Sequence, residues 1–204
     1  NGFDGSLTLP KNISIILDYS FANCSGFKGS LVIPENVTQI GLGCFQGCSG
    51  FDGTLALSNN LAIIKNNAFE NCCSFKGSLN LPDSIFEIGA EAFKLCSGFD
   101  GSLKLPNNKN YKFISSHSFE GCVGLKGSLI IPNCITEINK YAFKGCSGFD
   151  CDLNLSINLK YIREFAFEGC SGFDCSLILP DSLIMIENGS FKDCSGFVGS
   201  LTIP

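Results

Sequence analysis

The amino-acid sequence predicts a solenoid, a stack of similar coils that carries a parallel sheet of very short strands. The phrase CSGF and its variants recur with cysteines 24 residues apart, except for one interval of 26, at Cys24, Cys48, Cys72, Cys96, Cys122, Cys146, Cys170 and Cys194. A fixed period in the twenties is typical of repeat architectures, in which each coil contacts only its neighbours. Such a stack is expected to present a long surface rather than to run a reaction.

Each coil contains two aliphatic residues two positions apart, and in most coils a proline follows them. This period of two places both aliphatic side chains on one face of a strand and the middle residue on the other. Proline cannot donate a ladder hydrogen bond, so we expect the strand to end there. One very short strand per coil is therefore predicted, at Leu31/Ile33, Leu55/Leu57, Leu79/Leu81, Leu103/Leu105, Leu129/Ile131, Leu153/Leu155 and Leu177/Leu179.

The remainder of each coil repeats an Ile, an Ala-Phe-x-x-Cys stretch and a second Phe, which we interpret as inward positions of a continuous core. The Ala-Phe-x-x-Cys stretch is too short for a stable helix and is expected to form a helical or 3₁₀ turn. The fifth coil is two residues longer than the others, because NNKNYKF lies between Pro106 and Ile114. We expect this insertion to swell the loop after the fifth strand and to disturb the stack locally.

Composition agrees with a repeated core and excludes several classes of protein. Hydrophobic residues make up 45% of the chain and charged residues 16%, and there are 19 Phe and no Trp. The longest apolar runs fall far short of the roughly 20 residues needed to cross a bilayer. With a net charge of −5 and no basic stripe, the chain is not expected to bind nucleic acid. Both ends fall within a coil, so residues 1–204 are expected to be a single array of about eight coils from a longer protein.

The cysteines are interpreted mainly as core residues. A cysteine that recurs once per coil, three residues after a Phe, suits a small apolar residue packed between coils. A metal site would require clustered ligands, and the chain has one histidine, so we expect no metal. Cys151 and Cys175 replace a Gly in adjacent coils, where equivalent atoms lie about 5 Å apart, a separation that a disulfide accepts. We expect a Cys151–Cys175 bond in an extracellular protein and free thiols in a cytosolic one.

Charges alternate in sign down two columns of the repeat. One column reads Asp4, Lys28, Asp52, Lys76, Asp100 and Lys126, and the other Glu70, Lys94, Glu120, Lys144, Glu168 and Lys192. Alternation places opposite charges on neighbouring coils, whereas a constant sign would repel. The first column then continues with Asp150 and Asp174, which leaves either a small acidic patch for a cation or basic partner or a tolerated surface substitution.

The residue between the two inward aliphatics points out of the predicted sheet and is the candidate partner-binding position. This row is chemically mixed, unlike the core columns, and consists of Val32, Ala56, Asn80, Lys104, Ile130, Asn154 and Ile178. A long, shallow, weakly charged face suits a protein or glycan surface better than a small molecule, which needs a concave pocket. The alternative is that these residues only fill the outer surface of a sheet.

Nothing in the sequence indicates catalysis or a cofactor. An enzyme needs a nucleophile with a base, paired carboxylates in a cleft, or a metal. His117 occupies a variable outward column and is interpreted as a solvated loop residue, and the glycines serve repeated turns rather than a phosphate loop. We predict that the chain is not an enzyme and needs no cofactor.

The run LxIPxxVxxIGxxxFxxC, from Leu31 to Cys48, resembles the BspA-like, or treponemal-type, leucine-rich repeats, and the phrase CSGFKGSLVI favours their branch in mucosal protozoan parasites. The resemblance covers the whole chain. It implies an α/β-class leucine-rich-repeat solenoid, right-handed and curved, with irregular or 3₁₀ backs.

The same resemblance implies a role as a cell-surface or secreted adhesin that binds host-cell, matrix or microbial ligands, which are proteins or glycoproteins. Two alternatives remain open: an intracellular scaffold for protein–protein interaction, which would be cytoplasmic, and a passive surface spacer. End-to-end self-association of exposed end coils is a further expectation.

Overall fold

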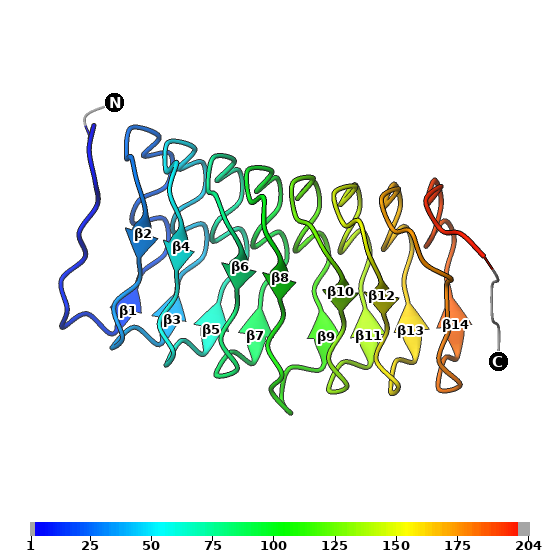
Figure 1. The fold of residues 1–204 in the computed structure, drawn as a ribbon. Coiled ribbons are helices and arrows are strands. Elements are labelled where there is room, and N and C mark those ends of the chain that lie inside the picture. The colour runs from blue at the N-terminus through cyan, green and yellow to red at the C-terminus, as the bar shows by residue number, and fades with distance from the viewer. Residues whose placement is uncertain (1–2, 200–204) are drawn as a thin grey trace.

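The computed structural model describes residues 3–199 as a row of coils that advance steadily from the N-terminal to the C-terminal end (Figure 1). Fourteen strands of two residues each are its regular elements, and every paired strand runs parallel to its partner. The expected parallel-strand solenoid is thereby confirmed, with about seven coils.

The coils from β2 to β13 carry two short strands each, so the expectation of one strand per coil is wrong. At the predicted Leu177/Leu179 strand the described part of the chain shows only a single bridge residue, Ile178. The predicted set, which we call the Leu strands, comprises β2 (Leu31–Val32), β4 (Leu55–Ala56), β6 (Leu79–Asn80), β8 (Leu103–Lys104), β10 (Leu129–Ile130) and β12 (Leu153–Asn154). The second set, the Ile strands, comprises β1 (Ile15–Ile16), β3 (Gln39–Ile40), β5 (Ile63–Ile64), β7 (Glu87–Ile88), β9 (Phe113–Ile114), β11 (Glu137–Ile138), β13 (Tyr161–Ile162) and β14 (Met185–Ile186). The two sets run in opposite directions within a coil (Figure 1).

The Ala-Phe-x-x-Cys stretch closes each coil as a series of single turns, and no helical or 3₁₀ segment occurs between residues 3 and 199. Within a turn the amide of Cys48 donates to the carbonyl oxygen of Phe45 over 3.0 Å. The amide of Phe45 instead donates to Ala68 of the next coil over 2.8 Å. Because alternate amides bond to the neighbouring coil, the turn cannot continue as a helix.

The core is built from two columns of phenylalanine rings. One column is unbroken from Phe21 to Phe191, with ring centroids 5.2–5.7 Å apart and nearly parallel planes. The other is interrupted by Leu125, which lies between the stacked pair Phe75–Phe99 and the stacked pair Phe149–Phe173. Each buried aromatic ring removes about 150–250 Å² from water, so stacking of coils supplies most of the hydrophobic stabilisation.

The longer fifth coil coincides with a break in the hydrogen-bonded stack. The Ile strands form two sheets, β1-β3-β5-β7 and β14-β13-β11-β9, which separate between β7 and β9. In this coil Tyr111 replaces an aliphatic residue and is 1% exposed. Its hydroxyl group has no hydrogen-bond partner among the described residues.

Candidate binding face

The predicted partner-binding row lies on the outer surface of the Leu strands. Its last member, Ile178, has the same position in the coil that follows β12. Each member is exposed, while the Leu that precedes it is buried in all six strands. The three aliphatic members are the most informative, since Val32 is 58% exposed, Ile130 59% and Ile178 63%. The complete row is Val32, Ala56, Asn80, Lys104, Ile130, Asn154 and Ile178.

The Leu strands are hydrogen-bonded in twos rather than in one continuous sheet. The pairs are β2-β4, β6-β8 and β10-β12, and they can be followed as closely spaced arrows in Figure 1. Side chains reinforce the same pairing: the hydroxyl oxygens of Ser30 and Thr54 lie 3.2 Å apart, as do those of Ser78 and Ser102. The binding face therefore repeats every two coils.

The first charge column explains this pairing in a way that the sequence did not reveal. Asp52 Oδ1 accepts a hydrogen bond from the amide of Gly29 over 2.7 Å, and Asp100 and Asp150 do the same for Gly77 and Gly127. The opposite charges on neighbouring coils form no Asp–Lys ion pair among the described residues of this column, because these three Asp side chains bind the backbone next to the Lys instead. A carboxylate on an amide is a charge-assisted bond, which favours pairing of a Lys coil with the Asp coil that follows it.

The second charge column does form ion pairs between coils. Glu168 lies between Lys144 and Lys192, with N–O distances of 2.7 and 2.9 Å, and Lys94 lies 3.4 Å from Glu120. A further bridge was not foreseen: Arg163 contacts Glu137 over 2.6 Å and Glu187 over 2.8 Å, so one guanidinium joins three coils. These two carboxylates raise the pKa of Arg163.

The repeated cysteines line the core as thiols with a defined hydrogen-bond partner. Sγ of Cys96 donates to the carbonyl oxygen of Phe69 over 3.0 Å, and Cys72, Cys122 and Cys146 make the same bond at 3.0–3.1 Å. Burial raises the pKa of Cys122 to about 12, so this thiol stays protonated. A buried, neutral thiol is a poor nucleophile and metal ligand, which assigns this column to structure.

The two cysteines predicted to pair lie close to the same stretch of backbone. Sγ of Cys175 accepts a hydrogen bond from the amide of Leu153 over 3.5 Å, two residues beyond Cys151. Cys151 is exposed and Cys175 is half-buried, and both are free thiols. Desolvation raises the pKa of Cys151, and the nearby carboxylate of Asp150 raises it further. The Cys151–Cys175 disulfide stays a prediction.

His117 is held in an aromatic stack and is not a freely solvated loop residue. Its ring stacks on Tyr141 with centroids 4.7 Å apart, and Tyr141 stacks on Phe165 at 5.3 Å. Nδ1 of His117 lies 2.7 Å from Glu120 Oε2. This column has positive φ in every coil from Tyr19 to Gly189, so the side chains lean onto the neighbouring coil. Between residues 3 and 199 no group of three or more metal-ligating side chains comes together.

The outer row of the Ile strands is a surface that the sequence reasoning missed. In this row the side chains of Ile15, Phe113 and Met185 are each about half exposed. The row also contains Glu87 and Glu137, which form ion pairs. The signal was available, since a variable residue precedes each repeated Ile. It was overlooked because a single strand was assigned to each coil. No helix in the described part of the chain has the length and apolarity of a membrane span.

A parallel-strand solenoid with these repeated Leu, Ile, Phe and Cys columns is a leucine-rich repeat protein. The family model described as BspA type Leucine rich repeat region matches residues 5–126 and 112–204, with six copies, and the chain belongs to this family. A comparison with curated proteins finds no match.

Solved structures share the fold. A leucine-rich repeat protein from Bacteroides ovatus is 26% identical with a TM-score of 0.76, over 93% of this chain and 52% of that one. The T. pallidum leucine-rich repeat protein is 22% identical with a TM-score of 0.60, over 93% and 76% of the two chains. The chain thus spans about half the length of the Bacteroides protein. Both proteins are bacterial, and the resemblance to the protozoan branch stays a prediction.

Proposed function

We propose that this chain is a non-catalytic protein-binding module of a cell-surface or secreted adhesin, and that it binds its ligand through the outer face of the Leu strands. The observation that carries the proposal is the exposed, chemically mixed row on a repeated array, in which aliphatic Val32, Ile130 and Ile178 are interspersed among smaller and polar residues. Exposed aliphatic side chains on a rigid scaffold supply the desolvated centre of a protein interface.

The mode of binding follows from the geometry of the array. Successive members of the row project from neighbouring coils, so a ligand that spans several coils makes many contacts of modest strength. The ligand class is a protein or glycoprotein of a host cell, of the extracellular matrix or of another microbe, as the family resemblance implies. The fold alone does not fix this role.

A cytoplasmic scaffold is the second candidate, and the cysteine column favours it. The thiols that donate to Phe carbonyl oxygens must be reduced to do so, and cytosol keeps thiols reduced. Burial protects the same thiols in an oxidising medium, so the column also suits a surface protein. A passive spacer is the third candidate, because a rigid stack can hold another domain away from a membrane.

Surface exposure on the source cells separates these candidates. Antibody against the segment is applied to intact and to permeabilised cells, and intact cells are treated with protease as a check. Labelling of intact cells that protease removes supports the adhesin. Labelling only after permeabilisation overturns it in favour of the scaffold.

Binding of the purified segment to host cells and to matrix proteins then separates adhesin from spacer. Ile178→Asp and Val32→Asp are expected to weaken binding while leaving the fold intact. Ile157→Asp is the matched control, because Ile157 is similarly exposed and lies in a turn outside the row. Absence of binding by the unaltered segment identifies a spacer.

A further inference from the structure

Two grooves hollow the binding face, one of about 610 Å³ beside Val32 and one in the middle of the array beside Ile130. The groove beside Ile130 lies between β8 and β10, which are not hydrogen-bonded to each other, and has a volume of about 500 Å³. The coils remain joined just before these strands, where the amide of Lys126 donates to Gly101 over 2.9 Å. The strands then separate because β8 pairs back to β6 and β10 pairs forward to β12. The two-coil pattern of pairing thus leaves room for the groove at this point.

The lining of the groove combines hydrogen-bonding groups with one apolar wall. Ser102, Lys104 and Asn107 lie on one side, and Ser128, Ile130 and Asn133 lie on the other. Ile130 is the exposed part of the apolar lining, with 59% of its surface exposed, whereas Leu103, Leu105 and Ile131 are buried. A groove of this kind suits an extended segment that offers one large aliphatic side chain and several polar groups.

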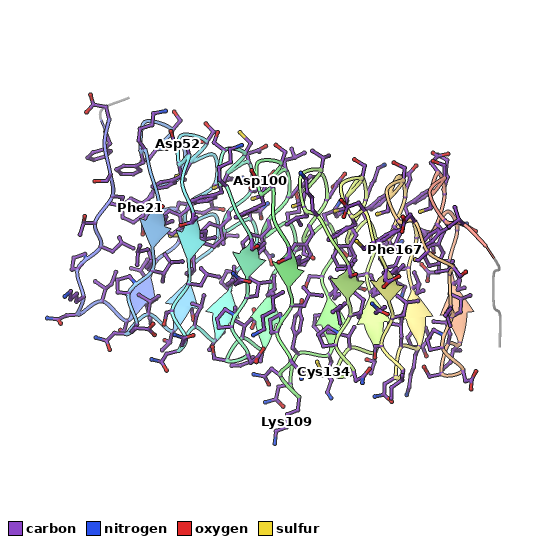
Figure 2. All side chains as sticks on the ribbon, in the orientation of Figure 1. Phe21, Asp52, Asp100, Lys109, Cys134 and Phe167 are labelled. Atoms are coloured by element: carbon purple, nitrogen blue, oxygen red, sulfur yellow. The ribbon has the colours of Figure 1, made fainter. Side chains whose placement is uncertain are left out.

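The long fifth coil places two further lysines shortly after Asn107, which lines this groove together with Lys104. Lys104, Lys109 and Lys112 fall within nine residues that contain no acidic residue, in a chain of net charge −5. Lys109 projects from the lower edge of the array, beyond the other turns (Figure 2). Among the described residues neither Lys109 nor Lys112 lies in an ion pair.

Lys104 has one acidic neighbour, Asp83, at 3.2 Å. Both side chains are 55% exposed, and an ion pair this accessible contributes little and exchanges partners readily. Lys104 can therefore turn from Asp83 to a carboxylate in the groove. The positive charges concentrated here are matched by a partner of opposite sign, because complementary potentials favour encounter and fix orientation.

We propose that the groove between β8 and β10, together with the lysines at its end, is the docking site for an acidic peptide segment of the partner protein. This inference rests on the proposed binding function. A large aliphatic side chain of that segment packs on Ile130, and its carboxylates face Lys104, Lys109 and Lys112. The longer turn of the fifth coil is then a specificity element, since Lys109 lies in this turn and Lys112 closely follows it.

Selection from a display library of random peptides about a dozen residues long tests this assignment on the whole chain. The enriched peptides are expected to combine Asp or Glu with Leu, Ile or Met. Affinity for one enriched peptide should fall about tenfold or more in Ile130→Asp and in the double variant Lys109→Glu, Lys112→Glu, as expected for a central contact and for charge reversal. It should also fall as salt screens the charges.

Matched controls locate the site. Ile184→Asp places the same change at an exposed aliphatic residue outside the row, and Lys160→Glu reverses an exposed lysine far from the groove; neither should alter affinity. Enriched peptides without acidic residues, or no enrichment at all, overturn the inference. Binding that responds to Ile178→Asp and not to Ile130→Asp overturns it while sparing the binding face. The proposed function is judged separately, by the binding of the segment to cells and matrix.

Discussion

The thiol of Cys96 and the carbonyl oxygen of Phe69 form a hydrogen bond of 3.0 Å between adjacent coils. Both residues are fully buried, and the thiol is a second donor to an oxygen that already accepts the amide of Cys72 over 3.1 Å. The same contact recurs along the array, for example from Cys122 to Phe93 and from Cys170 to Phe143. The cysteine column therefore has a polar role in addition to packing, which explains why a thiol rather than a methyl group occupies it.

Replacing Cys96 by Ala should destabilise the array by about 1–2 kcal/mol, because the buried Phe69 oxygen loses one of its two donors and a small cavity opens. The measurement is urea unfolding followed by circular dichroism. Cys73→Ala is the control, since Cys73 is exposed, and it should change stability by less than about 0.5 kcal/mol. Equal stability of the two variants would show that the thiol bond contributes nothing.

Alkaline pH should destabilise the protein through the same column. Burial raises the pKa of Cys48 and of Cys122 from 9.0 to about 12. The unfolded chain releases these protons first, so the stabilisation is complete below pH 9 and is lost as pH rises toward 12. Each thiol contributes a slope of about 1.4 kcal/mol per pH unit in this window.

The control for this pH dependence is Cys122→Ala, which removes one titrating thiol. Its unfolding free energy should fall less steeply above pH 9 than that of the unaltered protein, although it starts from a lower value. Identical slopes would mean that lysine and tyrosine side chains, and not the buried thiols, govern the alkaline loss.

Oxidation should join Cys151 to Cys175. With oxidised glutathione as oxidant, the two thiols lose two electrons and two protons, and glutathione is reduced to two thiols. Peptide mass spectrometry without reduction should then find the cross-linked pair, and Cys151→Ser should abolish it. Labelling of both thiols by an alkylating reagent after oxidation would exclude the bond. The exposed Cys73 serves as the reactive reference thiol.

The repeat period was enough to predict the solenoid, the Leu strands and the core columns, because a periodic pattern that buries the same side chain in every coil leaves few other folds. The Ile strands could not be placed so easily. In each Ile strand only two residues pair with the next coil. The outward residues of these strands, from Gln39 to Met185, share no common chemistry. The variable residue before each Ile is a weaker signal than the repeated Leu-x-Leu pattern, because no second aliphatic column stands two positions from the Ile.

The row of outward residues that forms the candidate site could be predicted from the sequence, but the pairing of the Leu strands in twos could not. Alternation of Lys28 with Asp52 was visible in the sequence, but its consequence was misjudged, since the carboxylate binds the amide of Gly29 and not the lysine. In the sequence, an Asp that bonds to the backbone of the neighbouring coil gives the same alternation of Lys and Asp as an Asp that forms an ion pair. The pairing of Leu strands, and with it the groove beside Ile130, therefore emerges only from coordinates.

Gly189 should not tolerate a side chain while Phe165 is present. Its φ of +65° is disfavoured for other residues, and a Cβ atom there would overlap the Phe165 ring that leans over it. Gly189→Ala should cost about 1–3 kcal/mol, the range for strained backbone. In the double variant Gly189→Ala, Phe165→Ala the overlap disappears, so part of the lost stability should be recovered. The expected coupling energy is about 0.5–3 kcal/mol. Strict additivity in thermal unfolding would refute the contact.

Tyr111→Phe should stabilise the protein or leave its stability unchanged, although it deletes a polar group. The Tyr111 hydroxyl group is buried in the long coil without a hydrogen-bond partner among the described residues, and an unsatisfied buried group costs about 1–3 kcal/mol. Phe keeps the ring and removes that cost. Phe143→Ala is the opposite control: it empties a stacked position of the core and should cost about 3–5 kcal/mol. Urea unfolding measures both variants. A clear loss of stability in Tyr111→Phe would mean that the hydroxyl group is satisfied in solution, most simply by a water molecule admitted where the two-residue insertion loosens the stack.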